Sequence, residues 1–124
     1  MLPEQRLQLL EKQYAYAVEN ILVLQITDET LKVLFVLSDG STLRIVERWR
    51  AGLLIRYSYY WLDQANQLRI GWDNAPHHDT VSTHPHHRHV AGQEAILPSA
   101  ATRLEDVMVE IGDLLTDVGA VQRR

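Results

Sequence analysis

Six histidines lie together in the middle of the chain, between His77 and His89. They fall into two short segments, WDNAPHH at residues 72–78 and THPHHRHV at residues 83–90. Imidazole both accepts and donates protons near neutral pH, and it is also a common ligand of zinc and similar metals. The concentration of histidines therefore predicts either proton-transfer chemistry or metal binding.

Metal-free cleavage of an RNA phosphodiester bond is the chemistry that we favour for these segments. The reaction needs a base for the ribose 2′-hydroxyl, an acid for the leaving oxygen and a cation near the phosphate. Two histidines and Arg88 could fill these roles, while Asp73 could orient one imidazole and Asn74 could donate a hydrogen bond to the phosphate. The predicted catalytic residues are Asp73, His77, His78, His86, His87 and His89.

Two alternatives stay open for the same histidines. The pairs His84/His86 and His87/His89 are each two residues apart, and an extended chain points such pairs to the same side, as a metal site requires. The segments could also form a loop that only faces solvent or a partner. We favour proton transfer over metal binding, so we assign no metal ligand and no cofactor.

A second candidate surface follows from the alternation of side chains along two predicted strands. If the turn near Gly52 has two residues, Arg44 and Arg48 share a face with Tyr57 and Tyr59. Arginines beside aromatic rings could bind a phosphate backbone and stack bases, although a turn of odd length would reverse the faces. The predicted substrate-binding residues are Arg44, Arg48, Tyr57, Tyr59, Asn74 and Arg88.

Glu47 lies in one of these strands, and its carboxylate could be catalytic. A carboxylate near the centre of a sheet is more often paired with a cation. We therefore favour a structural pairing of Glu47 with Lys32 or Arg56.

Helices are predicted at both ends of the chain. At residues 3–18, apolar side chains recur at alternating spacings of three and four from Leu7 to Ile21, and Pro3 suits the first turn. At residues 102–118, Thr102 and Glu105 form a capping-box motif ahead of a second stripe with the same spacing. Both stripes are interpreted as faces that pack on a core.

Residues 19–73 are predicted to form five antiparallel strands in a meander. The clearest turn is SDGS at residues 38–41, where Asp-Gly favours a two-residue hairpin turn that places Val36 opposite Leu43 and Lys32 opposite Glu47. Residues 74–101 contain three prolines and no apolar period, so we predict a long histidine-rich loop. The predicted fold is α+β, a five-stranded antiparallel sheet with an N-terminal helix and a C-terminal helix packed on it.

Size and composition limit the possible protein classes. A chain of 124 residues fits one domain, which we place at residues 1–124, and its net charge of −4 argues against coating nucleic acid through bulk charge. The absence of cysteine excludes disulfides and thiolate metal sites. The polar start MLPEQRLQLLEKQ does not resemble a secretory signal, and no apolar run approaches the roughly 20 residues of a membrane helix. We expect a cytoplasmic protein without a membrane segment, and the oligomeric state is not predictable.

Both histidine segments, with their surroundings, resemble the TumE family of toxins from bacterial toxin–antitoxin systems. Residues 72–78 and 85–90 carry the specific signature, and SDGS at 38–41, RYSY at 56–59 and Leu97-Pro98 before the last helix match its context. The resemblance implies a toxin encoded beside a cognate antitoxin protein. It also implies functional roles for Asp73, Asn74, His77, His78, His86, His87 and His89.

This chain departs from the family pattern at two positions. His84 stands where the family more usually has an aromatic residue, so His84 is not expected to be essential. Tyr60 stands where the family often has a histidine, so any role of that histidine must be filled differently.

The function predicted from these observations is that of the toxin of a type II toxin–antitoxin system, acting as a metal-independent endoribonuclease through its histidine cluster. Its expected partners are the antitoxin and RNA. One alternative is a non-enzymatic toxin or binding protein that blocks a cellular partner, and the other is a histidine-based metal-binding protein.

Overall fold

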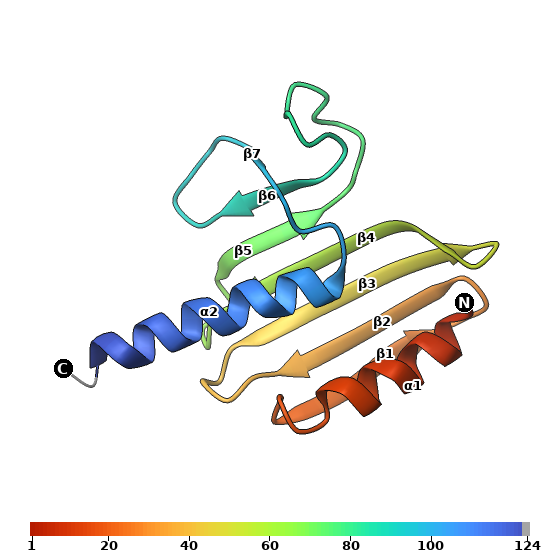
Figure 1. Cartoon of the computed structure of the whole chain (residues 1–124), viewed down its shortest axis with the longest axis horizontal. Coiled ribbons are helices and arrows are strands. Elements are labelled where there is room, and N and C mark those ends of the chain that lie inside the picture. The colour runs from red at the N-terminus through yellow and green to blue at the C-terminus, as the bar shows by residue number, and fades with distance from the viewer. Residues whose placement is uncertain (123–124) are drawn as a thin grey trace.

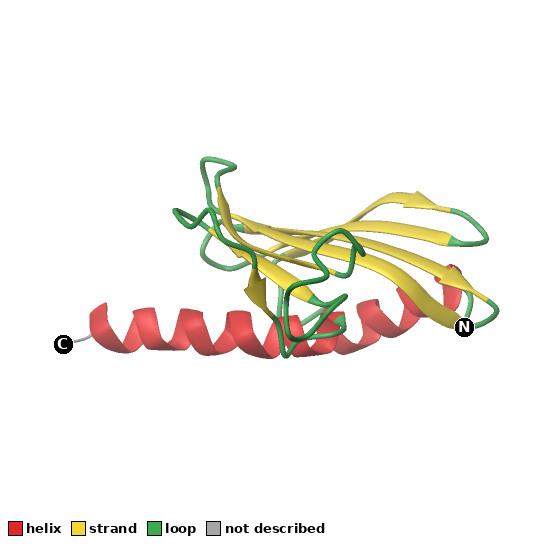
Figure 2. Cartoon of the chain, turned by 90° about the horizontal axis from the view of Figure 1, so that it is seen from above, coloured by secondary structure: helices red, strands yellow, loops and turns green. Residues whose placement is uncertain are grey.

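A computed structural model describes the backbone of residues 1–122 and the side chains up to Thr116. One layer is an antiparallel seven-stranded sheet whose strands lie in chain order, and the other layer consists of two helices on one face of that sheet (Figures 1 and 2). The helices are α1 (Pro3–Tyr14) and α2 (Leu104–Gln122). The strands are β1 (Asn20–Ile26), β2 (Thr30–Val36), β3 (Thr42–Arg50), β4 (Leu53–Leu62), β5 (Leu68–Asp73), β6 (His87–Val90) and β7 (Leu97–Pro98). We call the face of the sheet that lies away from these helices the open face.

The predicted α+β fold with a helix at each end is confirmed, but the predicted count of five strands is wrong. The additional strands, β6 and β7, lie within residues 74–101, which were expected to be a loop. β6 pairs with β5 and places His87 directly opposite Asp73. Because β6 has the sequence HRHV, it shows no alternation of apolar and polar residues by which a strand is recognised.

The helices also differ from their predicted bounds. α1 ends at Tyr14 rather than Val18, because a turn follows in which the backbone N–H groups of Ala17 and Val18 both donate to the Tyr14 carbonyl. α2 begins at Leu104 and continues to Gln122, four residues beyond the predicted end. The last residue of the predicted apolar stripe, at position 118, lies outside the described side chains.

The predicted capping box of α2 is replaced by another arrangement. The backbone N–H of Thr102 donates to the Asp106 carboxylate at 3.0 Å. Glu105 instead lies 2.6 Å from a guanidinium nitrogen of Arg6 on α1. The Glu105 carboxylate, which the capping box would have used, therefore forms an ion pair between the two helices instead.

The hairpin between β2 and β3 has a three-residue loop rather than the predicted two-residue turn. Leu37 donates its backbone N–H to the Ser41 carbonyl at 2.9 Å, and Gly40 adopts a φ of +82°, which suits the end of such a loop. Asp39 supports the loop because its carboxylate accepts hydrogen bonds from both the backbone and the hydroxyl of Ser41.

This extra loop residue makes the predicted register of the hairpin wrong by one position. Leu43 pairs with Phe35 instead of Val36, and Glu47 pairs with Leu31 instead of Lys32. A shift of one residue moves every side chain of a strand to the other face. Lys32 consequently lies on the open face, away from Glu47.

The turn between β3 and β4 has two residues, but β4 carries a bulge next to it. Trp49 pairs with Leu54, whereas the preceding Arg48 pairs with Arg56, so Ile55 is an extra residue without a partner. The bulge exchanges the two faces to which successive side chains of β4 point. The second candidate surface was predicted on the assumption that this alternation is unbroken, and that assumption is wrong.

The core lies between the sheet and the two helices. Alternate residues of β2, β3, β4 and β5 supply its sheet side, and the apolar stripes of α1 and α2 supply the other side. Its buried members include Leu10, Val33, Phe35, Leu43, Ile45, Tyr59, Trp61, Trp72, Leu104, Val107 and Ile111. Trp72 also donates its indole N–H to Glu110 of α2 at 3.0 Å, which fixes α2 over β5.

Glu47 lies fully buried in this core and has a structural role. Its carboxylate accepts hydrogen bonds from Arg6 at 2.9 and 3.0 Å, from the Tyr59 hydroxyl at 2.6 Å and from the Trp49 indole at 3.1 Å. Burial lowers the pKa of the Arg6 guanidinium, but Glu47 and Glu105 raise it by a larger amount, so Arg6 stays charged. The cation that pairs with Glu47 thus comes from α1 and not from either predicted residue.

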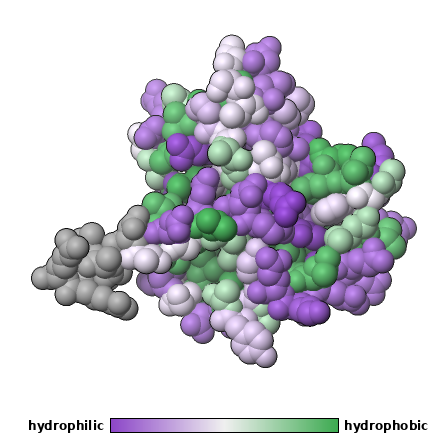
Figure 3. Space-filling view, viewed as in Figure 1, coloured by the Kyte–Doolittle hydropathy of each residue, from purple (hydrophilic) through white to green (hydrophobic). Residues whose placement is uncertain are grey.

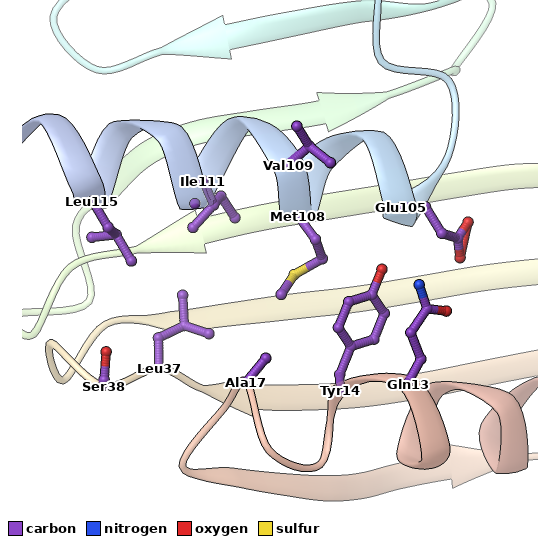
Figure 4. A pocket seen from close by; sticks show the side chains of 11 residues that line it. Gln13, Tyr14, Ala17, Leu37, Ser38, Glu105, Met108, Val109, Ile111 and Leu115 are labelled. Carbon is purple, nitrogen blue, oxygen red and sulfur yellow. The ribbon is translucent and has the colours of Figure 1, made fainter.

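An apolar groove separates α1 and α2 on the helix-bearing face, which Figure 3 shows from the front. Side chains from the end of α1, from the turn after β2 and from α2 point into it, among them Tyr14, Leu37, Met108 and Leu115 (Figure 4). None of its lining residues is a histidine. Neither of the helices, over the residues described, is long and apolar enough to cross a membrane.

Candidate functional site

Asp73, His87 and His89 meet on the open face, where β5 pairs with β6. Asp73 Oδ1 lies 2.9 Å from His87 Nε2, and Asp73 Oδ2 lies 3.3 Å from His89 Nε2. The two histidines point to the same side because they are two residues apart in a strand. The side chain of His87 is 1% exposed and that of His89 is 29% exposed, so solvent reaches this cluster at His89.

A third imidazole, that of His78, packs against this cluster from the segment after β5. Its ring centroid lies 4.8 Å from that of His87 and 6.1 Å from that of His89, and it stands edge-on to both. His78 is partly exposed. Imidazoles from both histidine segments therefore converge beside β5, as proton transfer by two histidines requires.

Tyr60 holds the carboxylate of the cluster in place. Its hydroxyl donates to Asp73 Oδ2 at 3.1 Å, while the backbone N–H of Ala75 donates to Oδ1 at 2.9 Å. Burial, together with the charge of Asp73, raises the pKa of Tyr60 to about 12, so the hydroxyl keeps its proton at neutral pH. Tyr60 lies across Gly71 on β5, where a Cβ atom would come within 2.9 Å of the tyrosine ring.

Hydrogen bonds determine where the protons of His87 can lie. His87 Nδ1 is 2.9 Å from the Pro85 carbonyl oxygen, which can only accept, so Nδ1 carries a hydrogen. His87 Nε2 faces a carboxylate oxygen of Asp73, which is also an acceptor. A proton on Nε2, or another cation between these two atoms, is needed to make this contact favourable.

His89 has one ring nitrogen that can exchange protons with a ligand. Its Nε2 faces Asp73, and its Nδ1 has no hydrogen-bond partner among the described residues. When Nε2 donates its hydrogen to Asp73, Nδ1 carries the lone pair and can act as a base. The sequence analysis predicted that Asp73 orients one imidazole, and His89 is one of the two imidazoles that lie in contact with it.

A cationic groove of about 440 Å³ runs along the open face to Asp73. Its lining includes Lys32, Arg48 and Arg56, together with Tyr60. None of these three cations forms an ion pair with another residue in the described part of the chain. A chain with a net charge of −4 therefore presents a local positive surface next to its histidine cluster.

His86 lies on the opposite side of the chain from this cluster, although it was predicted to belong with His87. Its Nδ1 is 2.8 Å from the hydroxyl of Tyr57, and the two rings are stacked at 5.8 Å. Burial and, to a smaller extent, the charge of His87 lower the pKa of His86. His86 borders a separate pocket with Arg6 and Arg103, on the helix side of the sheet.

Asn74 and Arg88 make contacts within the protein instead of facing the groove. The Asn74 side chain accepts from the backbone N–H of Tyr57 at 2.8 Å and donates to the Ile55 carbonyl at 3.3 Å, which clamps the bulge of β4. Arg88 of β6 pairs with Trp72 of β5, and its side chain donates to the Pro98 carbonyl at 3.1 Å. The structure therefore places neither side chain beside Asp73.

The predicted sharing of one face by arginines and tyrosines is wrong. Tyr57 and Tyr59 are buried beneath the helices, whereas Arg44 and Arg48 are exposed on the open face. The bulge at Ile55 is the cause, because it shifts the alternation of β4 by one residue. The remaining predicted residue, His77, is exposed and makes no hydrogen bond with the described part of the chain.

Lys32, Arg56 and Tyr60 belong to the site but were not predicted as site residues. Lys32 and Arg56 were interpreted only as possible partners of Glu47. Tyr60 could have been identified as a site residue, since it stands at the position where the family that the chain resembles often has a histidine. Gly71 within a strand was a second signal, because such a glycine often marks the close approach of another group.

The cluster also contains the donor atoms of a metal site. One oxygen of Asp73 and one nitrogen each of His87 and His89 all lie within 4.8 Å of one another. Two histidines and a carboxylate form a ligand set that is common for zinc. The same three side chains could thus transfer protons or hold a metal ion.

Comparison with known proteins gave one family. The family model described as "Toxin TumE" matches residues 6–122, which is nearly the whole chain and includes every residue of the cluster. Neither the curated proteins nor the solved structures gave a match.

Proposed function

Because the chain belongs to the TumE toxin family, we propose that it is the toxin of a type II toxin–antitoxin pair and that it arrests growth by cleaving RNA. A protein antitoxin would be its partner, and the cytoplasm would be its place of action. The observation that carries the proposal is the contact between His89 and Asp73, because Asp73 lines the end of the cationic groove and His89 Nδ1 has no hydrogen-bond partner among the described residues.

His89 is the general base in this proposal. Asp73 accepts the hydrogen on His89 Nε2, and Nδ1 then removes the proton from a ribose 2′-hydroxyl. The 2′-oxygen attacks the adjacent phosphorus while the bond from phosphorus to the 5′-oxygen breaks. The products are a 2′,3′-cyclic phosphate and a 5′-hydroxyl.

His78 is the general acid that the leaving 5′-oxygen needs. Its ring centre lies 6.1 Å from that of His89, so a phosphate could be flanked by the two imidazoles. A proton carried by His78 passes to the 5′-oxygen as the bond breaks. His87 is buried and has both ring nitrogens engaged, so its role is to position Asp73.

The groove explains why RNA is the preferred substrate class. Lys32, Arg48 and Arg56 offer positive charge to the phosphates on either side of the cleaved bond. Serine and tyrosine hydroxyls in the same groove, from Ser58 and Tyr60, could contact ribose or base edges. A single strand would lie along the open face, which no helix covers in the described residues (Figure 2).

Expression of variants from an inducible promoter tests the proposal. His89→Ala should relieve growth arrest and should slow RNA cleavage by the purified protein by about 10²–10⁴-fold, the usual contribution of a general base. His84→Ala is the matched control, since His84 lies in the same segment and its side chain, among the described residues, forms a hydrogen bond only with the backbone carbonyl of His78. It should remain toxic.

The reaction products separate this mechanism from its alternatives. Cleavage should persist in the presence of a chelator and should leave cyclic phosphate ends. Growth arrest without any RNA cleavage would instead identify a toxin that blocks a cellular partner. Full toxicity of His89→Ala would remove the cluster from the mechanism.

A further inference from the structure

We infer that Asp73, His87 and His89 bind one transition-metal dication of the zinc class, and that the bound ion switches off the RNA cleavage proposed above. The second half of this inference rests on the proposed function, whereas the first half depends only on the geometry of the three side chains. The site is separate from the apolar groove between the helices and from the pocket that contains His86.

The donor atoms lie close enough together to serve as ligands of one zinc ion. With zinc–nitrogen bonds of 2.0–2.1 Å, neighbouring ligand atoms of a tetrahedral site lie about 3.3 Å apart. Asp73 makes its two contacts through different oxygens, with Oδ1 2.9 Å from His87 Nε2 and Oδ2 3.3 Å from His89 Nε2, and both distances are near this spacing. All three donor atoms fall within 4.8 Å of one another, so only small rotations of the rings would bring them to a common ion.

The hydrogen bonds around the cluster also fit a metal site. The Pro85 carbonyl accepts the hydrogen of His87 Nδ1, which leaves the lone pair of a neutral imidazole on Nε2, toward Asp73. Histidine ligands of metals usually have such a partner on the other nitrogen. Tyr60 and the backbone of Ala75 hold the carboxylate in the same way.

The contact between His87 and Asp73 needs a positive charge between its two atoms. Two lone pairs would otherwise face each other at 2.9 Å in a place that is almost closed to solvent. A dication between the two atoms satisfies this need, and it gains a third ligand from His89.

Metal binding and catalysis require opposite tautomers of His89. As a base, His89 keeps its hydrogen on Nε2 and its lone pair on Nδ1. As a ligand, it gives the Nε2 lone pair to the metal, so its hydrogen must lie on Nδ1, where it can no longer remove a proton. Occupation of the site therefore abolishes the base, while the fold and the cationic groove stay unchanged.

The ligand set indicates which ions bind. Two imidazoles with one carboxylate suit zinc and neighbouring transition metals. Magnesium and calcium prefer sites made of oxygen ligands and should bind poorly. Zinc chloride is thus the appropriate probe, and magnesium chloride is the control ion.

Competition with a coloured zinc chelator measures zinc binding to the protein independently of RNA cleavage. The full chain should take up one zinc ion per molecule and no magnesium. His89→Ala should weaken zinc binding by more than about 100-fold, since the loss of a mere hydrogen-bond partner of a ligand already costs ~10–100-fold. His84→Ala should bind zinc as the unaltered chain does, and circular dichroism should show both variants folded.

RNA cleavage provides the second measurement. Zinc should stop cleavage over the same concentration range in which it fills the site, and a chelator should restore it. The inference is overturned if no zinc is taken up, if His89→Ala binds zinc as tightly as the unaltered chain, or if zinc accelerates cleavage. Zinc uptake by a protein that cleaves no RNA under any condition would support the metal site and refute the proposed function instead.

Discussion

Replacing Arg6 with methionine tests whether the buried carboxylate of Glu47 serves the fold and not the chemistry. In the folded protein Glu47 is fully buried, and Arg6 supplies two of its four hydrogen bonds, at 2.9 and 3.0 Å. Arg6→Met keeps most of the apolar stem but leaves the negative charge without a cation. It also removes one ion pair of Glu105, whose other partner is Arg103.

The expected loss of folding stability follows from removing only one member of a buried ion pair. Removing one member of such a pair destabilises a protein by about 3–5 kcal/mol, because the other charge stays buried and unpaired. For a chain of this size 1 kcal/mol corresponds to about 4 °C in Tm, so Arg6→Met should lower Tm by roughly 12–20 °C. Urea and thermal denaturation followed by circular dichroism measure both quantities.

Two further variants make the test specific. Arg103→Met removes an ion pair at the surface, with 63% of the arginine side chain exposed, and should cost at most about 1 kcal/mol. Adding Glu47→Gln to Arg6→Met removes the stranded charge and should recover most of the loss. The reasoning fails if Arg6→Met is no worse than Arg103→Met, or if the double variant is less stable than Arg6→Met alone.

Two other predictions concern Gly71, which faces Tyr60, and Asp39 in the loop between β2 and β3. Gly71→Ala should displace the Tyr60 ring, because the new Cβ would lie 2.9 Å from it, and it should therefore lower RNA cleavage. The effect of Gly71→Ala should disappear when Tyr60 is also replaced by alanine. A double-mutant cycle measures this coupling between the two residues. Burial alone would raise the pKa of Asp39, but the hydrogen bonds of Ser41 and the charge of Arg69 lower it overall. A carboxyl with a lowered folded pKa contributes stability that is present above its unfolded value of about 3.9 and is lost as the pH falls through the folded pKa. The difference in urea midpoint between the unaltered chain and Asp39→Asn should therefore shrink from about pH 6 to about pH 3, and a constant difference would contradict this explanation.

The location of the candidate site could be predicted from the chain because it depends on local composition. The histidines are concentrated in residues 77–89, and a carboxylate stands just before them at Asp73. The family resemblance also rested on these contiguous residues, and the matching family model is in agreement with it. The two helices were likewise predictable, since the 3.6-residue period of a helix is a property of neighbouring positions.

Which histidines lie together was decided by the tertiary structure. His86 and His87 are adjacent in the sequence, yet one binds Tyr57 on the helix side and the other binds Asp73 on the open face. This division depends on β6, a strand whose composition gives no periodic signal and which is held in the sheet by pairing with β5 and β7.

The cationic groove forms because of two irregularities in the sheet, each of which inserts a single residue. The extra residue in the loop at Asp39 places Lys32 on the open face, and the bulge at Ile55 places Arg56 and Tyr60 beside it. Side chains in a sheet alternate with a period of two, so a single inserted residue exchanges the two faces completely. Composition and periodicity along the chain thus indicated where the histidines, the two helices and the first five strands lie, whereas pairing between strands determined which side chains meet.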